Sequence, residues 1–262
     1  MARRPAGGPL VPLGLFRDRN FSLANVAISV MGFSITASLI PIMIWAQVVR
    51  GLSPTRAALL LVPMALMTLL LARLVGRLTD RVHPRIITAF GFVCLFVGLL
   101  WLTSVMTPDT SIWWTVPPMV VFGVGNAFVW APNSATATRN LPVQQAGAGS
   151  GVYNATRQVG AVLGSAAIAV VIDSRLAAEG LPSFSGQAGG QGGGSLPPQV
   201  AQAFSDAMAT SILLPTAAFI LGFVAVLFFQ KPRHQGWGTA PAAAATETPK
   251  TAEAAPAAEQ TR

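Results

Sequence analysis

A single arginine within an apolar segment is the first candidate for chemistry in this chain. Arg157 interrupts the run of apolar and small residues at 146–172, which holds no other charge. A charge inside a membrane segment normally faces protein or a watery cavity, where it finds a partner. We take Arg157 as a candidate cavity-lining, substrate-contacting residue; the alternative is a side chain that extends to the cytoplasmic surface. The polar residues that could share such a cavity are Asn126, Asn133, Asn154 and Gln158.

A short charged loop between two apolar segments is the second candidate. Residues 76–85 read Gly-Arg-Leu-Thr-Asp-Arg-Val-His-Pro-Arg. Asp80 is the only carboxylate among these arginines, and it could cap the amino terminus of a neighbouring helix or pair with an arginine. Gly76 would let the two flanking helices approach each other. The alternative is a basic loop that only fixes the membrane topology.

The acidic residues and histidines lie away from the centres of the apolar segments. A proton-coupled carrier normally needs a carboxylate or histidine there, which titrates as the cavity changes sides. Asp173, at the end of its apolar run, is the nearest and a weak candidate. We therefore expect this chain by itself to lack the proton-coupling site. The sequence also shows no phosphate-binding glycine loop, metal-ligand cluster or nucleophile motif, so it does not indicate an enzyme.

The composition indicates the class of protein that must position these residues. Of the 262 residues, 52% are apolar and only 10% are charged, whereas soluble domains carry about 25% charged residues. A helix that crosses the hydrocarbon of a bilayer needs about 20 apolar residues. We predict an all-α polytopic membrane protein whose helices form one bundle. The six spans are predicted at residues 21–49, 57–75, 86–106, 111–135, 146–172 and 205–230.

Basic residues predict how the chain sits in the membrane. Most of the 17 Lys and Arg residues flank the spans on one side, which by the positive-inside rule puts both termini of this multi-pass plasma-membrane protein in the cytoplasm. Clustering at helix ends also argues against nucleic-acid binding. Residues 1–20 are then a cytoplasmic amino-terminal segment, 173–204 a flexible Gly-rich outer loop and 231–262 a disordered cytoplasmic tail.

Small residues recur along the fifth predicted span. Gly160 and Gly164 have the small-x-x-x-small spacing that lets membrane helices approach closely. Gly147 and Gly151 repeat this spacing earlier in the segment. We predict that these four glycines form a helix-packing face. Such a face could serve sliding between helices or static packing.

Several stretches resemble a known transporter family. The charged loop is similar to the cytoplasmic signature of the major facilitator superfamily, Gly-x-Leu-x-Asp-Arg-x-Gly-Arg-Arg. His83 and Pro84 depart from that signature. Residues 9–21, 51–54 and 147–164 resemble the fourteen-helix drug:proton antiporter branch of the EmrB/QacA type, and the likeness covers its last six helices. The loop residues that match are Gly76, Leu78, Asp80, Arg81 and Arg85.

The resemblance implies a function and a set of partners. It implies proton-coupled efflux of drug-like compounds by the carboxy-terminal half of a major facilitator transporter, with the matching loop residues as a cytoplasmic gating motif. It implies no cofactor, with the proton gradient as the energy source. The partners would be the lipid bilayer, a small-molecule substrate, and an amino-terminal half or a second half-transporter chain. The alternatives are a non-transporting membrane interaction or regulatory partner, and a carrier of a sugar, peptide or organic anion.

Overall fold

The computed structural model describes residues 13–141, 143–181 and 197–230, whose regular elements are all helices. The six predicted spans are confirmed: in this part of the chain, six helical stretches are long and apolar enough to cross a membrane. The elements are η1 Leu13–Arg17, α1 Arg19–Val48, α2 Pro54–Leu59, α3 Val62–Arg81, α4 Pro84–Val105, η2 Ile112–Thr115, α5 Val116–Thr138, α6 Val143–Ala178, α8 Pro198–Ser211 and α9 Leu213–Leu227.

Local signals in the sequence set where several helices begin. The Asp18 carboxylate accepts a hydrogen bond from the Phe21 backbone N–H at 2.8 Å and so caps α1. The ring of His83 accepts from the Arg85 N–H at 3.2 Å, and Pro84 occupies the first position of α4. Gly51, with φ of +60°, turns the chain between α1 and α2.

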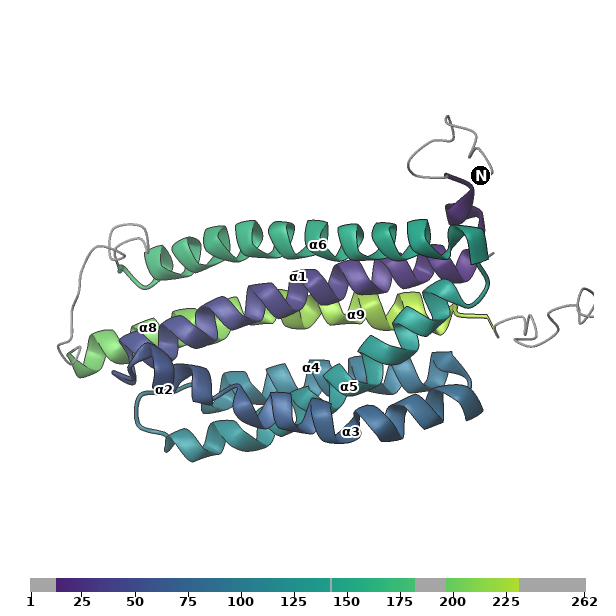
Figure 1. Cartoon of the computed structure of the whole chain (residues 1–262). Helices are drawn as coiled ribbons and strands as arrows, with labels where there is room; N and C mark the ends of the chain where they lie inside the picture. The colour runs from purple at the N-terminus through teal and green to yellow at the C-terminus, as the bar shows by residue number, and fades with distance from the viewer. Residues whose placement is uncertain (1–12, 142, 182–196, 231–262) are drawn as a thin grey trace, which may run out of the picture.

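The helices run side by side along one direction (Figure 1). α1 packs against α6 and α9, α5 packs against α3 and α4, and α4 packs against α9. The bundle can thus be divided into two three-helix units, α1–α3–α4 and α5–α6–α9, that pack against each other in a reciprocal way. α1, the first helix of one unit, packs against α6, the second helix of the other, and α5 packs against α3 in the same manner. The most fully buried aromatic side chains of the described bundle are Phe21, Trp45, Phe92, Phe122, Phe204 and Phe219.

Two spans are poorly covered by the rest of the bundle. Within the most apolar stretch of each span, the buried share is only 6% in the Pro54–Arg81 span and 28% in the Gln145–Ala178 span. The buried share is 44–50% in the other four spans. Many of the exposed side chains on α3 and α6 are nevertheless apolar, among them Leu69 and Val162. A bilayer or a second helical bundle must therefore cover α3 and α6.

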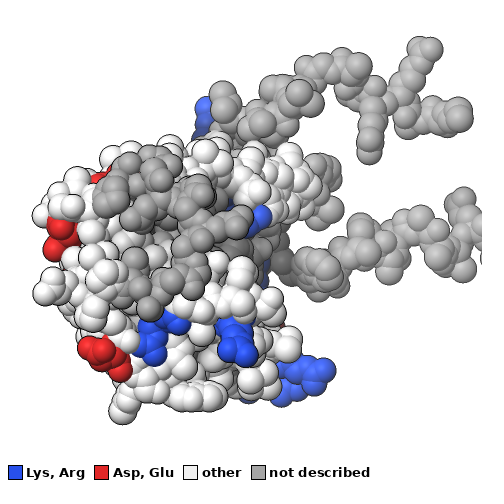
Figure 2. All heavy atoms as spheres, turned by 90° about the vertical axis from the view of Figure 1, so that its left-hand side faces the viewer, with Lys and Arg blue, Asp and Glu red and all other residues white. Residues whose placement is uncertain are grey.

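The two ends of the bundle differ in charge. Figure 2 shows the end with the α1–α2 turn, where both acidic and basic side chains are present. The opposite end carries an excess of arginine and holds the start of α1 and the end of α9 (Figure 1). There the Asn20 side chain donates to the Gln230 carbonyl and accepts from the Gln230 N–H, both at 2.9 Å. The two ends of the described chain are thus tied together.

Proline residues divide two of the predicted spans. The second span consists of α2 and α3, with the break just before Pro63, and the last span consists of α8 and α9, with the break at Ile212 before Pro215. Proline lacks an N–H, and its ring clashes with the carbonyl four residues earlier. The last predicted span, at 205–230, is thus observed as two consecutive helices.

The predicted outer loop at 173–204 is shorter than expected. α6 continues to Ala178 because Ile172 and Leu176, one helical turn apart, extend its buried stripe. α8 already begins at Pro198, a favourable first residue for a helix. The second span also continues past 75, to Arg81. Residues 182–196, the tail at 231–262 and residues 1–12 lie outside the described residues.

Candidate functional site

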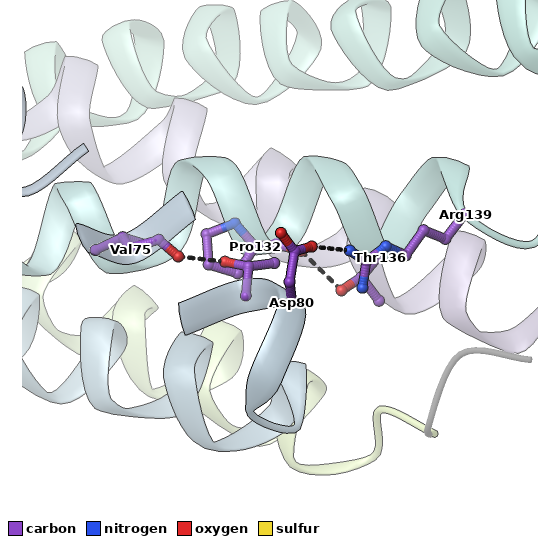
Figure 3. Close-up of polar contacts among 6 residues, drawn as sticks. Val75, Asp80, Pro132, Thr136 and Arg139 are labelled. Carbon is purple, nitrogen blue, oxygen red and sulfur yellow. Dashed lines mark hydrogen bonds and ion pairs between the residues drawn. The ribbon is translucent and has the colours of Figure 1, made fainter. Parts of the chain in front are cut away.

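The carboxylate of the charged loop pairs with an arginine from outside the loop. Asp80, in the last turn of α3, lies 2.5 Å from the Arg139 side chain, which directly follows α5 (Figure 3). Of the two partners considered for Asp80, an arginine rather than a helix terminus is observed. The carboxylate side is 69% exposed, so the pair is an exposed link between the ends of two helices.

The other residues of the loop have separate positions. Leu78 packs against a small buried cluster of Val75, Ile87 and Ala127. Arg81 and Arg85 are exposed and form no ion pair with a described residue. No atom of another described element lies within 4 Å of a side-chain carbon placed at Gly76, so the expected close helix approach at Gly76 is not observed. The flanking helices α3 and α4 make few contacts with each other.

Two threonines near the ion pair were not singled out from the sequence. Thr79 on α3 donates to the Val75 carbonyl at 2.7 Å, and Thr136 on α5 donates to the Pro132 carbonyl at 2.7 Å (Figure 3). Both side chains are buried. Their hydroxyls are satisfied within their own helices, so they do not require a partner where α3 packs against α5.

A buried polar contact joins three helices in the interior. Asn133 on α5 donates to the Tyr153 hydroxyl on α6 at 2.9 Å and to the Ala24 carbonyl on α1 at 3.1 Å. Asn133 is fully buried and Tyr153 is 5% exposed. Tyr153 was missed from the sequence, although it is the only tyrosine and precedes Arg157 by one helical turn.

Arg157 faces this interior contact. Its guanidinium carbon lies 5.7 Å from the centre of the Trp130 ring, a cation–π distance. The Trp130 indole donates to the Asn126 amide oxygen at 2.7 Å, and Tyr153 precedes Arg157 by one helical turn on α6. The side chain thus turns toward α5 instead of extending along α6. We call Asn126, Trp130, Asn133, Tyr153 and Arg157 the polar cluster.

Comparison with known proteins places this bundle in a family. The family model described as Major Facilitator Superfamily matches residues 2–165. The chain belongs to the Major Facilitator Superfamily. A Mycobacterium tuberculosis protein named "Uncharacterized MFS-type transporter Rv1250" is 46% identical over 86% of this chain and 40% of its own length. The "Tetracenomycin C resistance and export protein" of Streptomyces glaucescens is 30% identical over 64% of this chain and 31% of its own length.

The "Multidrug export protein EmrB" of Escherichia coli is 24% identical over 60% of this chain and 31% of its own length. The matching regions of these major facilitator relatives thus span 40% or less of each relative's length. The polar cluster offers a positive charge and hydrogen-bonding groups, in a bundle of this family whose α3 and α6 are poorly covered.

The other two residues predicted near Arg157 are not part of the polar cluster. Asn154 and Gln158 are exposed, and Asn154 bonds only within its helix, to the Ser150 carbonyl at 3.0 Å. Asn154 directly follows Tyr153, and Gln158 directly follows Arg157. One residue along a helix turns the side-chain direction by about 100°, so Asn154 and Gln158 point away from the polar cluster. The structure therefore links Asn126 to Arg157 through Trp130, bonds Asn133 to Tyr153 one turn before Arg157, and exposes Asn154 and Gln158 on α6 of this major facilitator bundle.

The predicted glycines divide in the same way. A side-chain carbon at Gly160 would lie 2.1 Å from the Ser29 carbonyl oxygen, and one at Gly164 would lie 2.3 Å from that of Phe33. On α1, a side-chain carbon at Gly32 would lie 2.2 Å from the Arg157 carbonyl oxygen. The α1–α6 contact thus requires glycine on both helices. The remaining two glycines, which do not pack against another helix of this bundle, are Gly147 and Gly151.

Two apolar grooves open between the helices of the bundle. One of about 410 Å³ lies between α1, α6 and α9, with Phe33, Gly160 and Leu221 in its walls. The other, of about 260 Å³, lies between α4 and α9 and is lined by Phe92, Phe96 and Phe219 among others. Neither groove contains a charged side chain, so in this major facilitator bundle both are suited to hydrocarbon.

Proposed function

We propose that this chain is the carboxy-terminal six-helix half of a transporter that exports drug-like compounds in exchange for protons. The observation that carries the proposal is a major facilitator bundle of six spans in which α3 and α6 remain uncovered. Relatives whose names state drug resistance or export support the direction of transport and the class of cargo. The family fold alternates access between two bundles, so one bundle supplies one wall of the cavity.

The proposed partner is a second six-helix bundle against α3 and α6, either an amino-terminal half or a second chain of this kind. Gly147 and Gly151 support this proposal, because they leave α6 smooth on its uncovered side. Asn154 and Gln158 would face the cavity on that side. Arg157 would supply a positive charge behind them, at the boundary between the cavity and the polar cluster.

The proposed orientation has both termini in the cytoplasm of a plasma-membrane protein. The excess of basic residues at the end that holds Asn20 and Gln230 supports this orientation. In this orientation the Asp80–Arg139 pair lies at the cytoplasmic end. It would hold the ends of α3 and α5 together as the transporter changes state, while Arg81 and Arg85 remain available to the partner bundle.

The proton-coupling group would come from the partner bundle. All acidic residues of the described chain lie in loops or toward the ends of spans, for example Asp80 and Asp173. The same observation favours a second candidate function, in which this half-transporter acts only as a membrane interaction or regulatory partner. Arg157 is the observation that favours a third, transport of an organic anion, since a cation within a membrane span attracts negative charge.

Deleting the gene from its source cell tests the proposal. We expect the deletion to raise accumulation of a fluorescent cationic dye, and a copy of the gene with its native flanking sequence to reverse this. A protonophore should remove the difference between the strains. Unchanged accumulation of every dye, with the protein present in the membrane of the parent strain, contradicts efflux. Unchanged dye accumulation with altered accumulation of an anionic compound favours the third function.

A further inference from the structure

Several buried polar atoms have no protein partner in the region of the polar cluster. Among the described residues, the Asn133 amide oxygen, the Asn126 amide nitrogen and the Arg157 Nε are buried without a hydrogen bond. Asn133 and Asn126 are 0% and 5% exposed. In hydrocarbon each unsatisfied group costs several kcal/mol, since no bulk water can replace the missing partner.

These unpartnered atoms belong to one connected region. Asn133 contacts Tyr153, Tyr153 lies one helical turn from Arg157, Arg157 stacks over Trp130, and Trp130 bonds Asn126. The Tyr153 hydroxyl accepts from Asn133, which leaves its own hydrogen free to be donated. The region therefore offers unused donors and unused acceptors, alternating between α5 and α6.

The polar region continues toward the end of the bundle that holds the start of α1. The Asn25 amide oxygen, one residue after the Ala24 carbonyl that Asn133 contacts, is also buried without a partner. Beyond it, the Asn140 amide oxygen lacks a partner, while its nitrogen donates to Asp18 at 3.1 Å. Arg157 stands roughly 21 Å along α6 from Val143 at 1.5 Å per residue.

We infer that water molecules bind between α1, α5 and α6 in a file that runs from Asn140 to Arg157 and includes the Tyr153 hydroxyl. Buried water typically makes about three hydrogen bonds to otherwise unsatisfied groups, and it alone can both donate and accept at each of these atoms. A metal ion is disfavoured by the Arg157 charge, and the carboxylate that adjoins the file, that of Asp18, lies at the opposite end and is already bonded to Asn140. An apolar ligand would leave the amides unsatisfied.

Such a file gives Arg157 hydration inside the membrane. Water at its Nε would supply the missing hydrogen bond at a depth where an isolated charge is costly. The file lies within one bundle, apart from the proposed cavity between two bundles. We therefore expect water at Tyr153 and Arg157 whether or not the chain transports anything.

Hydroxyl-radical footprinting of the full chain in lipid nanodiscs tests the inference, because a buried side chain reacts only where bound water supplies the radical. Tyr153 is the sole tyrosine, and Trp45 is an internal control that is 1% exposed with its indole bonded to Ser205. With each normalised to the denatured chain, we expect Tyr153 to be labelled several-fold more than Trp45. Equal labelling of the two overturns the inference.

Two variants locate the water. Asn133→Leu removes a central pair of hydrogen-bonding atoms and should bring the labelling of Tyr153 down to that of Trp45. Ser34→Ala, which removes another buried unpartnered hydroxyl outside the file, should leave the labelling of Tyr153 unchanged. Low labelling of Trp45 in each variant shows that the bundle is intact. If Asn133→Leu is folded and its Tyr153 is labelled as strongly as in the parent, the inference is overturned. If Trp45 becomes labelled in Asn133→Leu, that variant is unfolded, and Asn126→Leu takes its place in the same test.

Discussion

The side chains of Asp80 and Arg139 meet at 2.5 Å across the ends of α3 and α5. They are 59 positions apart in the chain; Asp80 is the last residue but one of α3, and Arg139 directly follows α5. Because the pair is exposed, its contribution to the free energy of unfolding is small. Its effect is to fix where two helix ends lie relative to each other.

Neutralising this pair should affect transport more than stability. For Asp80→Asn we expect the free energy of unfolding to fall by no more than about 1 kcal/mol, the range for exposed ion pairs, and dye efflux to fall clearly. The double exchange Asp80→Arg with Arg139→Asp should recover efflux, because it restores attraction between the helix ends. Efflux that stays low in the exchanged protein, at normal membrane levels, would show that the pair does not act as a link.

Glycine substitutions should separate the two faces of α6. Gly164→Ala puts a carbon 2.3 Å from the Phe33 carbonyl, so we expect a loss of stability of several kcal/mol as α1 and α6 separate, comparable to severe core defects. Gly151→Ala has free space and should be neutral or stabilising by up to about 1 kcal/mol through helix propensity. Unfolding in denaturing detergent measures both. Equal effects would contradict the assigned contact face.

The same Gly151 position tests the proposed partner bundle. Gly151→Leu should leave the folding of this chain unchanged, since no atom of another described element lies within 4 Å of a side-chain carbon placed at Gly151. In cells it should lower efflux, because a large side chain would hold the second bundle away from α6. Leu69→Met, a conservative change on the uncovered face of α3, serves as the matched control. Normal efflux by Gly151→Leu would place the partner elsewhere.

A double-mutant cycle should detect the contact between Asn133 and Tyr153. Tyr153→Phe removes the hydroxyl that accepts from Asn133 at 2.9 Å, and we expect a coupling free energy of about 1 kcal/mol with Asn133→Ala. Asn154→Ala removes an exposed amide bonded only within its own helix and should change stability by less than about 0.5 kcal/mol. Additive effects of the first two substitutions would show that the bond is not formed in the membrane.

Much of the fold could be predicted from the sequence because hydropathy alone sets which segments enter the bilayer. The breaks before Pro63 and Pro215 follow from proline chemistry, so the local sequence does contain them. The partner of Asp80 could not be predicted, since Arg139 becomes its neighbour only when α3 packs on α5. The division of α6 was equally hidden: glycines lie on both of its faces, and only the position of α1 decides that Gly160 packs within the bundle and Gly147 does not.

Exchange of substrate for protons in inverted membrane vesicles tests the central claim most directly. The vesicles would come from source cells that carry the intact gene with its native flanking sequence, and a pH-sensitive dye would report the proton gradient. We predict that added substrate dissipates the gradient in these vesicles and fails to do so with Arg157→Ala, while Arg56→Ala, an exposed arginine on α2, behaves as the parent. A gradient that substrate leaves unchanged, with the protein present at normal levels, would contradict proton-coupled export.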